Sequence, residues 1–464
     1  MTLPVPAREL TTDALSELIA QRRLDALKSL LTEHGPPDIA EAIDRLSDDE
    51  EAIAFRLLDT DTAWQVFEHL SFEAQERLLH TLSDVDAAAI LEEMSADDRT
   101  ALLEDLPGKV TRRMLNLLSP EERRRAVQLL GYPEESIGRV MTPDYVRVKP
   151  HWSVAEALEH IRVFGHDSET LNVVYVVEPG GVLIDDLRIR QLLTVDPRTK
   201  VAELMDDQFV ALNVLDDEES AVAVFRKHDR TALPVVDKEG VLVGIVTVDD
   251  VLDIQEREAT EDIQMLGGVE ALDEPYLDVS VWTMVRKRGV WLVILLFGGM
   301  LTAEAMSAYE EQLASAVVLA IFLPLIIASG GNSGSQAATL ITRALALGEV
   351  RLNDWWRVMR REVASGLLLG LLLGTLGFAR IALWALAFDA YGPHWLLVAI
   401  TVGVSLVGVV VWGSLSGSLL PLLLKRLGAD PATSSAPFIA TLVDVTGIII
   451  FFSIAMVFLS GTLL

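Results

Sequence analysis

Residues 436–452 read APFIATLVDVTGIIIFF, an apolar run with one acidic residue, Asp444. About 20 apolar residues in a helix cross the hydrocarbon core of a bilayer, so the run predicts a membrane span over Ala436–Leu459. A carboxylate at that depth costs several kcal/mol unless it meets water, a partner or a cation. Asp444 is therefore expected either to bond to a neighbouring helix or, as we favour, to bind a cation in an aqueous pathway. Thr441 and Gly447 beside it supply an oxygen and a point of close helix approach.

Four more apolar runs precede this one. They are roughly Val290–Tyr309, Leu313–Leu347 (with an interruption), Val363–Phe388 and Trp395–Leu424. Lys and Arg residues gather before the first run, between the second and third, and between the fourth and fifth, whereas the other two connections have none. By the positive-inside rule, five spans then place the N-terminus in the cytoplasm and the C-terminus outside. The sequence therefore predicts a multi-pass protein of the cell inner (plasma) membrane, with a membrane domain over residues 286–464.

Charge is distributed unevenly along the 464 residues. The net charge is −30, yet residues 286–464 carry eleven basic and nine acidic residues, a net of +2, which leaves −32 on residues 1–285. Phosphate binding needs clustered Lys and Arg, so a nucleic-acid partner is excluded for the acidic part. The chain has no Cys, which excludes disulfides, thiolate metal sites and a cysteine nucleophile. No apolar run of signal-peptide type begins the chain, so the acidic part is expected in the cytoplasm.

The second span contains GGNSGSQA at residues 330–337. Irregular backbone at membrane depth is tolerated only inside protein or along water. Gly330, Gly331 and Asn332 are therefore expected to line a pore with freed backbone carbonyls, although simple helix packing explains any single glycine equally well. One carboxylate among hydroxyl and carbonyl oxygens favours a hard cation, Mg²⁺ or Ca²⁺, and a path with few protein ligands favours Mg²⁺.

Residues 1–131 are predicted to be an acidic, α-helical domain. Five serines each come directly after a Leu or Met, and successive serines lie 12 or 24 residues apart. They are Ser47, Ser71, Ser83, Ser95 and Ser119. Each is suited to cap a helix start, and four have an acid three residues later, as in a capping box. Short helices that each bury a Leu/Ala face are expected to stack as in an α-solenoid. Most acids of this domain are then caps or solvated residues.

Residues 132–247 change to alternating strands and helices. From Met141-Thr142-Pro143 onward the pattern resembles a tandem pair of cystathionine-β-synthase (CBS) domains, and GIVTVDD at 244–250 matches the usual end of the second repeat. Such pairs commonly bind adenine nucleotides through a Thr and an Asp three residues later, here Thr247 and Asp250. The first repeat has Arg188 and Gln191 at these places, so the resemblance implies at most one site, for ATP or another adenine nucleotide.

Residues 248–285 form a connecting segment that starts with a helix. The helix is predicted over Val248–Leu266 and ends at Gly267-Gly268. At about 100° per residue, four acids share one side of it and Asp262 lies just beyond; the four are Asp250, Asp253, Glu258 and Glu261. Either the side is a solvated surface or cations neutralise it.

Together these features resemble the MgtE family of magnesium channels and transporters, most specifically in GGNSGSQA, SLLPLLLKRLGADP and PFIATLVDVTG. The resemblance implies a homodimer in which two copies of Asp444 form a pore Mg²⁺ site. It also implies that the connecting helix, the plug, closes the pore when cytosolic Mg²⁺ binds. The matching sensor acids are Asp97, Asp217, Glu219, Asp229, Asp250, Asp253, Glu258, Glu261 and Asp262. The family pattern has a second acid one helical turn after the residue that matches Asp97, and this chain has Ala101 at that place.

We therefore expect a Mg²⁺-selective channel under negative feedback from cytosolic Mg²⁺. Divalent ions that bridge facing carboxylates stabilise a closed state, because only a state with facing acids gains that energy. The alternative is a broader transporter of Mg²⁺, Co²⁺ and Mn²⁺ whose CBS pair mainly senses nucleotides. A third reading, a membrane-anchored enzyme, is disfavoured: the sequence has no GxxxxGK[ST] loop, and its eight His residues are scattered.

Overall fold

The computed structural model describes residues 10–272, 276, 277 and 279–463, and the side chain of Asp61 is not described. The first nine residues, on which the absence of a signal peptide depends, lie outside this range. The chain divides into two compact units, Met1–Gln255 and Glu256–Leu464.

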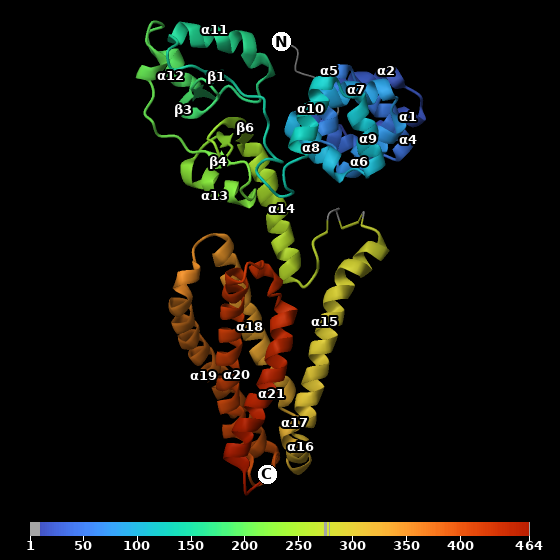
Figure 1. Cartoon of the computed structure of the whole chain (residues 1–464). Coiled ribbons are helices and arrows are strands. Elements are labelled where there is room, and N and C mark those ends of the chain that lie inside the picture. Colours follow the sequence, from blue (N-terminus) through green and yellow to red (C-terminus); the bar gives the residue numbers. More distant parts are fainter. Residues whose placement is uncertain (1–9, 273–275, 278, 464) are drawn as a thin grey trace, which may run out of the picture. The chain divides into compact units, whose positions relative to one another are not determined.

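The first part of unit 1 is a stack of ten short helices (Figure 1). They are α1 (Thr12–Ala20), α2 (Leu24–Thr32), α3 (Pro36–Ile43), α4 (Asp48–Phe55), α5 (Thr60–Glu68), α6 (Phe72–Thr81), α7 (Asp84–Glu93), α8 (Ala96–Asp105), α9 (Gly108–Leu117) and α10 (Pro120–Leu129). One apolar core runs through the stack from Leu15 to Ala126. The predicted solenoid-like helical domain is confirmed.

All five predicted serine caps are present. The hydroxyl groups of Ser71, Ser83, Ser95 and Ser119 accept hydrogen bonds from backbone N–H groups at the start of their helices. Ser47 forms a capping box with Glu50. A helix start leaves four backbone donors without intrahelical partners, which these oxygens partly satisfy. The caps explain how helices of only eight to ten residues can follow one another.

Two small sheets form the rest of unit 1. The strands are β1 (Arg147–Val148), β2 (Val173–Val177), β3 (Leu183–Arg188), β4 (Leu212–Asn213), β5 (Ala232–Val236) and β6 (Leu242–Thr247). The helices between them are α11 (Val154–Phe164), η1 (Gly165–Asp167), α12 (Ile189–Thr194), η2 (Val201–Glu203) and α13 (Glu219–His228). Each sheet has the same order, a parallel pair followed by an antiparallel pair. The internal repeat confirms the tandem CBS prediction.

The two sheets meet through their hairpins. Val182 bridges Val241, and the backbone N–H of Leu183 donates to the carbonyl oxygen of Gly240 at 3.0 Å. A shared apolar core lies between the sheets and includes Tyr175 and Ile245. Helix α14 (Val248–Leu266) follows β6 without a break, and its bounds agree with the sequence prediction.

Unit 2 consists of long helices joined by short helical segments. They are α15 (Val281–Ser307), α16 (Glu310–Ser315), α17 (Val317–Ala320), α18 (Leu323–Ala346), η3 (Leu352–Asp354), α19 (Trp355–Phe388), α20 (Trp395–Arg426), η4 (Pro431–Thr433) and α21 (Ala436–Leu459). Among the described residues, five stretches are long and apolar enough to cross a membrane, the number predicted. Helices α15 and α19 start earlier than expected, because the apolar count omits the charged turns with which these helices begin.

One prediction for the second span is wrong. The segment GGNSGSQA is regular α-helix within α18, and the interruption lies earlier, between α17 and α18. Its backbone carbonyls are therefore not freed in the way an irregular segment would free them. A methyl group on Gly334 would come within 3.1 Å of the carbonyl oxygen of Gly413 on α20. The glycines here allow close helix contact, the other reading of this motif.

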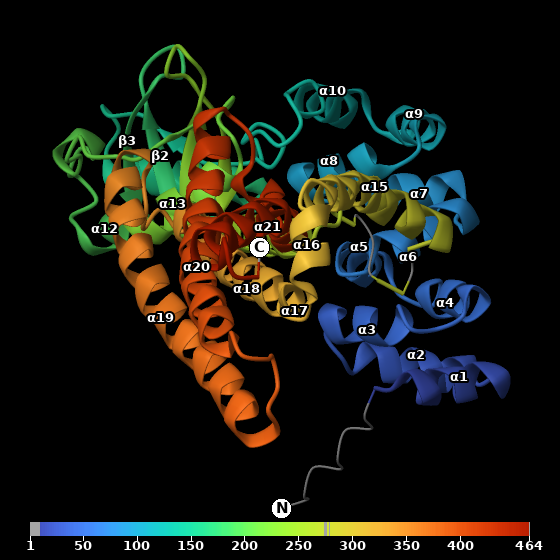
Figure 2. The ribbon, with the colours of Figure 1, turned by 90° about the horizontal axis from the view of Figure 1, so that it is seen from below.

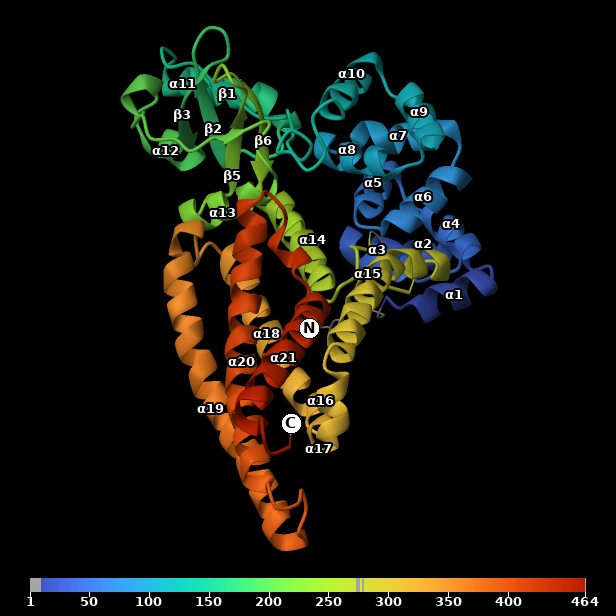
Figure 3. The same cartoon turned by 60° about the horizontal axis from the view of Figure 1, so that its bottom comes forward.

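Glycines also bring α19 against α20, and the two helices run side by side in all three views (Figures 1–3). A methyl group on Gly370 would lie 2.8 Å from the Cα atom of Val407, and one on Gly374 would lie 2.6 Å from the carbonyl oxygen of Gly403. Helix α18 packs on both α20 and α21, and α15 packs on α21. No residue of α15 is buried within the chain.

Candidate functional site

Asp444 lies on α21, half-buried, on the side that faces α18. A methyl group on Gly331 would lie 3.9 Å from Asp444 Oδ1 and 3.4 Å from Ala440 Cβ. Within the described part of the chain, the carboxylate of Asp444 has no hydrogen bond or ion pair with another side chain. The first expectation, a structural bond to a neighbouring helix, therefore finds no support in the observed contacts.

The other predicted pore-lining residues face different neighbours. Gly330 and Gly447 are buried against Val409 of α20, and Thr441 packs against Gly298 of α15. Asn332, one residue after Gly331, is exposed within the chain. The structure thus brings Gly331 next to Asp444, whereas Gly330 and Gly447 mainly permit close helix packing.

Hydroxyl groups fix α18 to its neighbours around this place. Ser333 Oγ lies 2.8 Å from Ser414 Oγ of α20, both buried. Ser335 Oγ donates a 3.0 Å hydrogen bond to the carbonyl oxygen of Ala436 at the start of α21. These side chains hold α18 beside α21, and neither hydrogen bond uses the carboxylate of Asp444.

A second concentration of charge lies in unit 1. Four segments contribute to it: the end of α5, the start of α8, the loop after η1 and the start of α14. We call it the acidic cluster: Glu68, Asp97, Asp98, Glu169, Asp249 and Asp250. Asp97 and Asp250 were predicted as sensor residues from different domains, and the structure places them close together.

The acidic cluster strongly perturbs its own titration. Burial, and then the negative charges of Asp250 and Asp98, raise the pKa of Asp97 well above its usual value. Burial and the charge of Asp98 raise the pKa of Glu68 to about 8. Glu169 keeps an exposed edge, yet partial burial and the charge of Asp97 raise its pKa to about 7. Burial raises the pKa of Asp250 to about 6, against hydrogen bonds from Thr247. The cluster therefore holds protons that a cation can displace.

The acidic cluster is a concentration of charge without a formed cation cage. Over residues 10–272, 276, 277 and 279–463, no three His, Asp or Glu side chains lie close enough to hold a metal ion together. Asp97 Oδ1 is buried without a hydrogen-bond partner. Small movements of the contributing segments, or water molecules between ion and carboxylates, are needed to build a site for Mg²⁺, which usually keeps several waters.

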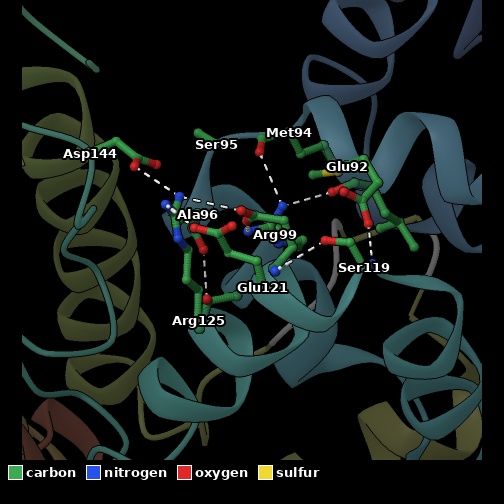
Figure 4. Close-up of polar contacts among 12 residues, drawn as sticks. Glu92, Met94, Ser95, Ala96, Arg99, Ser119, Glu121, Arg125 and Asp144 are labelled. Atoms are coloured by element: carbon green, nitrogen blue, oxygen red, sulfur yellow. Dashed lines mark hydrogen bonds and ion pairs between the residues drawn. The ribbon is translucent and has the colours of Figure 1, made fainter. Parts of the chain in front are cut away.

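A chain of ion pairs holds the helical domain to the CBS domains near this cluster (Figure 4). Arg99 is fully buried and forms an ion pair with Glu122 of α10. Arg125, also on α10, lies 3.0 Å from Asp144 of the first CBS repeat and 3.3 Å from Glu122. Burial raises the pKa of Asp144, and the Arg125 guanidinium opposes that shift. Arginine side chains thus hold one part of the boundary between the helical and CBS domains together, whereas like charges repel at the acidic cluster.

The remaining predicted sensor acids lie elsewhere. Asp217 Oδ1 accepts a hydrogen bond from the backbone N–H of Glu219 at the start of α13. Asp229 ends α13 in a left-handed conformation with φ of 48°. Four others follow one another along α14, at positions Asp253, Glu258, Glu261 and Asp262. Sequence reasoning missed Glu68, Asp98, Glu169 and Asp249 as members of the acidic cluster. No local pattern distinguishes Glu68 and Glu169 from solvated acids.

Thr247 and Asp250 have the geometry of the predicted nucleotide motif. Asp250 Oδ2 accepts hydrogen bonds from the backbone N–H of Thr247 at 2.9 Å and from its hydroxyl at 2.7 Å. In the first repeat, Gln191 Oε1 likewise accepts from the backbone N–H of Arg188 at 2.8 Å. Both turns are therefore alike in backbone, but only the second presents a hydroxyl and a carboxylate that suit a ribose.

A membrane domain with five candidate spans, joined to a CBS pair and an acidic helical domain, is the architecture of a family of divalent-cation transporters. Comparison with known families agrees. Residues 323–454 match MgtE, described as a divalent cation transporter; residues 34–135 match the MgtE intracellular N domain; and residues 184–257 match the CBS domain.

Individual relatives give the same result. Over 333 residues the chain is 44% identical to the magnesium transporter MgtE of Thermus thermophilus, covering 72% of each protein. It is 32% identical to the magnesium transporter MgtE of Bacillus subtilis over 335 residues, again 72% of each. The crystal structure of the cytosolic domain of the Mg²⁺ channel MgtE in complex with ATP superposes with a TM-score of 0.50 and 37% identity, covering 52% of this chain and 99% of that one. This chain belongs to the MgtE family.

Proposed function

We propose that this protein transports Mg²⁺ across the cell membrane as a channel, and that cytosolic Mg²⁺ closes it. The observation that carries the proposal is Asp444, a half-buried carboxylate on α21 beside Gly331 that has no protein partner in the described residues. Such a group at membrane depth is stable only with water or a cation. The magnesium transporters named above support Mg²⁺ as that cation.

The working unit in this proposal is a homodimer with its N-terminus in the cytoplasm and its C-terminus outside. Helix α15 buries none of its residues within one chain, and the Asp444 side of α21 is only partly covered. A second copy would cover such surfaces and bring two Asp444 carboxylates to one axis. Two carboxylates with hydrated Mg²⁺ between them fit the ion's preference for few protein ligands.

Feedback in this proposal comes from the acidic cluster and from the acids of α14. Burial raises the pKa values of Glu68, Asp97 and Asp250, and the negative charges of neighbouring acids in the cluster add to these shifts. Mg²⁺ bound among them favours the state in which the domains approach, and we assign that state to the closed pore. Asp217, Glu219 and Asp229 would contribute from the second CBS repeat.

A second candidate is a broader divalent-cation transporter whose CBS pair senses adenine nucleotide. The Thr247–Asp250 pair supports it, as does the ATP complex of the similar cytosolic domain. Because Asp250 also belongs to the acidic cluster, nucleotide and Mg²⁺ would share one carboxylate. Competition between Co²⁺, Mn²⁺ and Mg²⁺ in a flux assay separates the two candidates.

The decisive experiment measures Mg²⁺ flux into vesicles that contain the full chain. Asp444→Ala is expected to abolish flux, and Asp444→Glu to keep part of it, because the charge remains. Asp389→Asn, at the far end of α19, is the matched control and is expected to conduct normally. Full Mg²⁺ conduction by Asp444→Ala would show that this carboxylate is not the pore site.

A further inference from the structure

Unit 2 has an apolar groove of about 490 Å³ between the start of α19, the second half of α20 and α21. Trp355 and Met359 come from α19, and Trp412, Leu419, Leu423 and Arg426 come from α20. Two lining tryptophans are substantially exposed, Trp355 at 51% and Trp412 at 40%. The groove is separate from Gly331 and Asp444, neither of which lines it.

Arg426 gives this groove a charged end. It is the one charged residue among those that line the groove, and it lies in the last turn of α20. Within the described residues its guanidinium has no hydrogen bond or ion pair. The adjacent Lys425 Nζ instead reaches the carbonyl oxygen of Leu345 at 3.5 Å, and Arg357, near the start of α19, pairs with Asp354 at 3.2 Å. Among the described residues that line the groove, Arg426 is therefore the one that offers an anion a positive charge.

The dimensions fit one leaflet of a bilayer. From Trp412 to Arg426 the helix rises by about 21 Å, at about 1.5 Å per residue. Half of the hydrocarbon core is about 15 Å thick, which leaves room for a headgroup at the Arg426 end. Tryptophan is enriched at the membrane–water interface, which is where Trp355, the first residue of α19, is expected to lie.

The inner end of the groove contacts the helix that carries Asp444. Trp412 Nε1 donates a 2.7 Å hydrogen bond to Thr446 Oγ1 on α21. Thr446 follows Asp444 by two residues, on the same helix. A molecule that packs against the Trp412 indole therefore touches a group bonded to the helix of the isolated carboxylate.

We propose that this groove binds one anionic phospholipid, with its phosphate at Arg426 and one acyl chain along α20 as far as Trp412. The lipid holds the Trp412–Thr446 contact and thereby supports transport. Charge complementarity selects a lipid over a second copy of the chain, because the groove combines one unpaired cation with an apolar channel. The orientation proposed above would place this lipid in the cytoplasmic leaflet, and the effect on transport rests on the proposed function; the binding of the lipid rests on neither.

The experiment uses the full chain in phosphatidylcholine vesicles that contain a minor fraction of lipid with brominated acyl chains, which quench tryptophan on contact. The fluorescence that comes from Trp412 is obtained by subtracting the intensity of the Trp412→Phe variant from that of the wild-type protein. Brominated phosphatidylglycerol is expected to quench it at about fivefold lower mole fraction than brominated phosphatidylcholine, the preference that about 1 kcal/mol from one cation gives. Arg426→Gln is expected to abolish this preference, whereas Arg361→Gln, on α19 outside the groove, is expected to keep it.

Equal quenching by the two lipids in the wild-type protein would overturn the proposal, as would a preference that survives Arg426→Gln. If a second copy of the chain filled the groove, neither lipid would quench Trp412, which also overturns it. Mg²⁺ flux into the same vesicles is expected to rise with phosphatidylglycerol in the wild-type protein and to be insensitive to it in Arg426→Gln. The fluorescence assay measures lipid contact directly, so it tests this proposal even if the flux assay shows that the protein does not transport Mg²⁺.

Discussion

The carboxylates of Asp97 and Asp250 belong to different domains, yet the charge of Asp250 helps to raise the pKa of Asp97. Asp97 starts α8 of the helical domain, and Asp250 starts α14, the helix that leads toward the membrane part. The two groups repel each other in the absence of cations. Under the feedback proposed above, Mg²⁺ bound at this domain boundary would relieve that repulsion.

Replacing Asp97 by Asn is expected to stabilise the cytosolic part when Mg²⁺ is absent, because one of the repelling charges is removed. A gain of about 1 kcal/mol corresponds to about 2–4 °C in melting temperature for a protein of this size. The measurement is thermal unfolding of residues 1–275 in a chelator; a relative's cytosolic domain has been crystallised without its membrane part. Asp97→Asn is also expected to reduce the stabilisation by added Mg²⁺. Glu93→Gln, an exposed acid at the end of α7, is the control and is expected to change neither value.

The raised carboxyl pKa values predict a specific pH dependence without Mg²⁺. In the unfolded chain these groups titrate near 4, whereas the folded pKa of Glu68 is about 8 and that of Glu169 about 7. Between these values the folded state binds more protons, so stability falls as the pH rises from about 4 to about 8. Stabilisation by Mg²⁺ then increases with pH, since fewer protons compete.

Melting temperatures measured across this pH range in a chelator check the sign. Glu68→Gln is expected to flatten the decline, because it removes the group with the highest of these values. If the stability of the cytosolic part increased across this range, the folded acidic cluster would not hold the protons that its raised pKa values imply.

Close glycine contacts predict a clear difference between two alanine substitutions in the membrane domain. Gly374→Ala places a methyl group 2.6 Å from the carbonyl oxygen of Gly403, so α19 and α20 must separate. Overpacking of this kind costs about 1–3 kcal/mol. Gly299→Ala on α15 meets no atom within 4 Å in the chain and serves as the control. Thermal stability in detergent is the measurement, and equal stability of the two variants would show that the α19–α20 contact is not tight.

Sequence reasoning located the elements whose signal is local. The bounds of α14 and α21 agree with prediction, because each combines a clear periodic or apolar run with a cap or glycine at its end. It failed at residues 330–337, where glycines suggested irregular backbone. In a bilayer every backbone hydrogen bond must be made within the protein, which favours helix, and glycine there serves close packing.

The residues of the candidate sites were likewise predictable only where the sequence itself marks them. Asp444 was identifiable because a carboxylate in an apolar run is conspicuous, and Asp97 and Asp250 because the family resemblance marked them. Glu68 and Glu169 look like ordinary acids in the sequence, and only the packing of α5 and of the loop after η1 brings them to Asp98. The raised pKa of each depends on contacts between distant segments, which periodicity does not report.

Feedback by cytosolic Mg²⁺ is expected to depend on the carboxylates of α14. Asp250, Asp253, Glu258 and Glu261, all replaced by their amides, are expected to leave a channel that conducts Mg²⁺ but no longer closes when cytosolic Mg²⁺ rises. The closed state gains energy from Mg²⁺ only through carboxylates that face one another, and a channel without them has no differential affinity for the ion.

The measurement is patch-clamp current across a Mg²⁺ series on the cytosolic side. Asp13, Asp25, Glu33 and Glu93, four exposed acids of the helical domain, give a charge-matched control when replaced by their amides. That control is expected to close as the wild type does. If both variants lost inhibition alike, the general charge of the cytosolic part would be the sensor, and inhibition that persisted in the α14 variant would exclude this helix as a Mg²⁺-binding element.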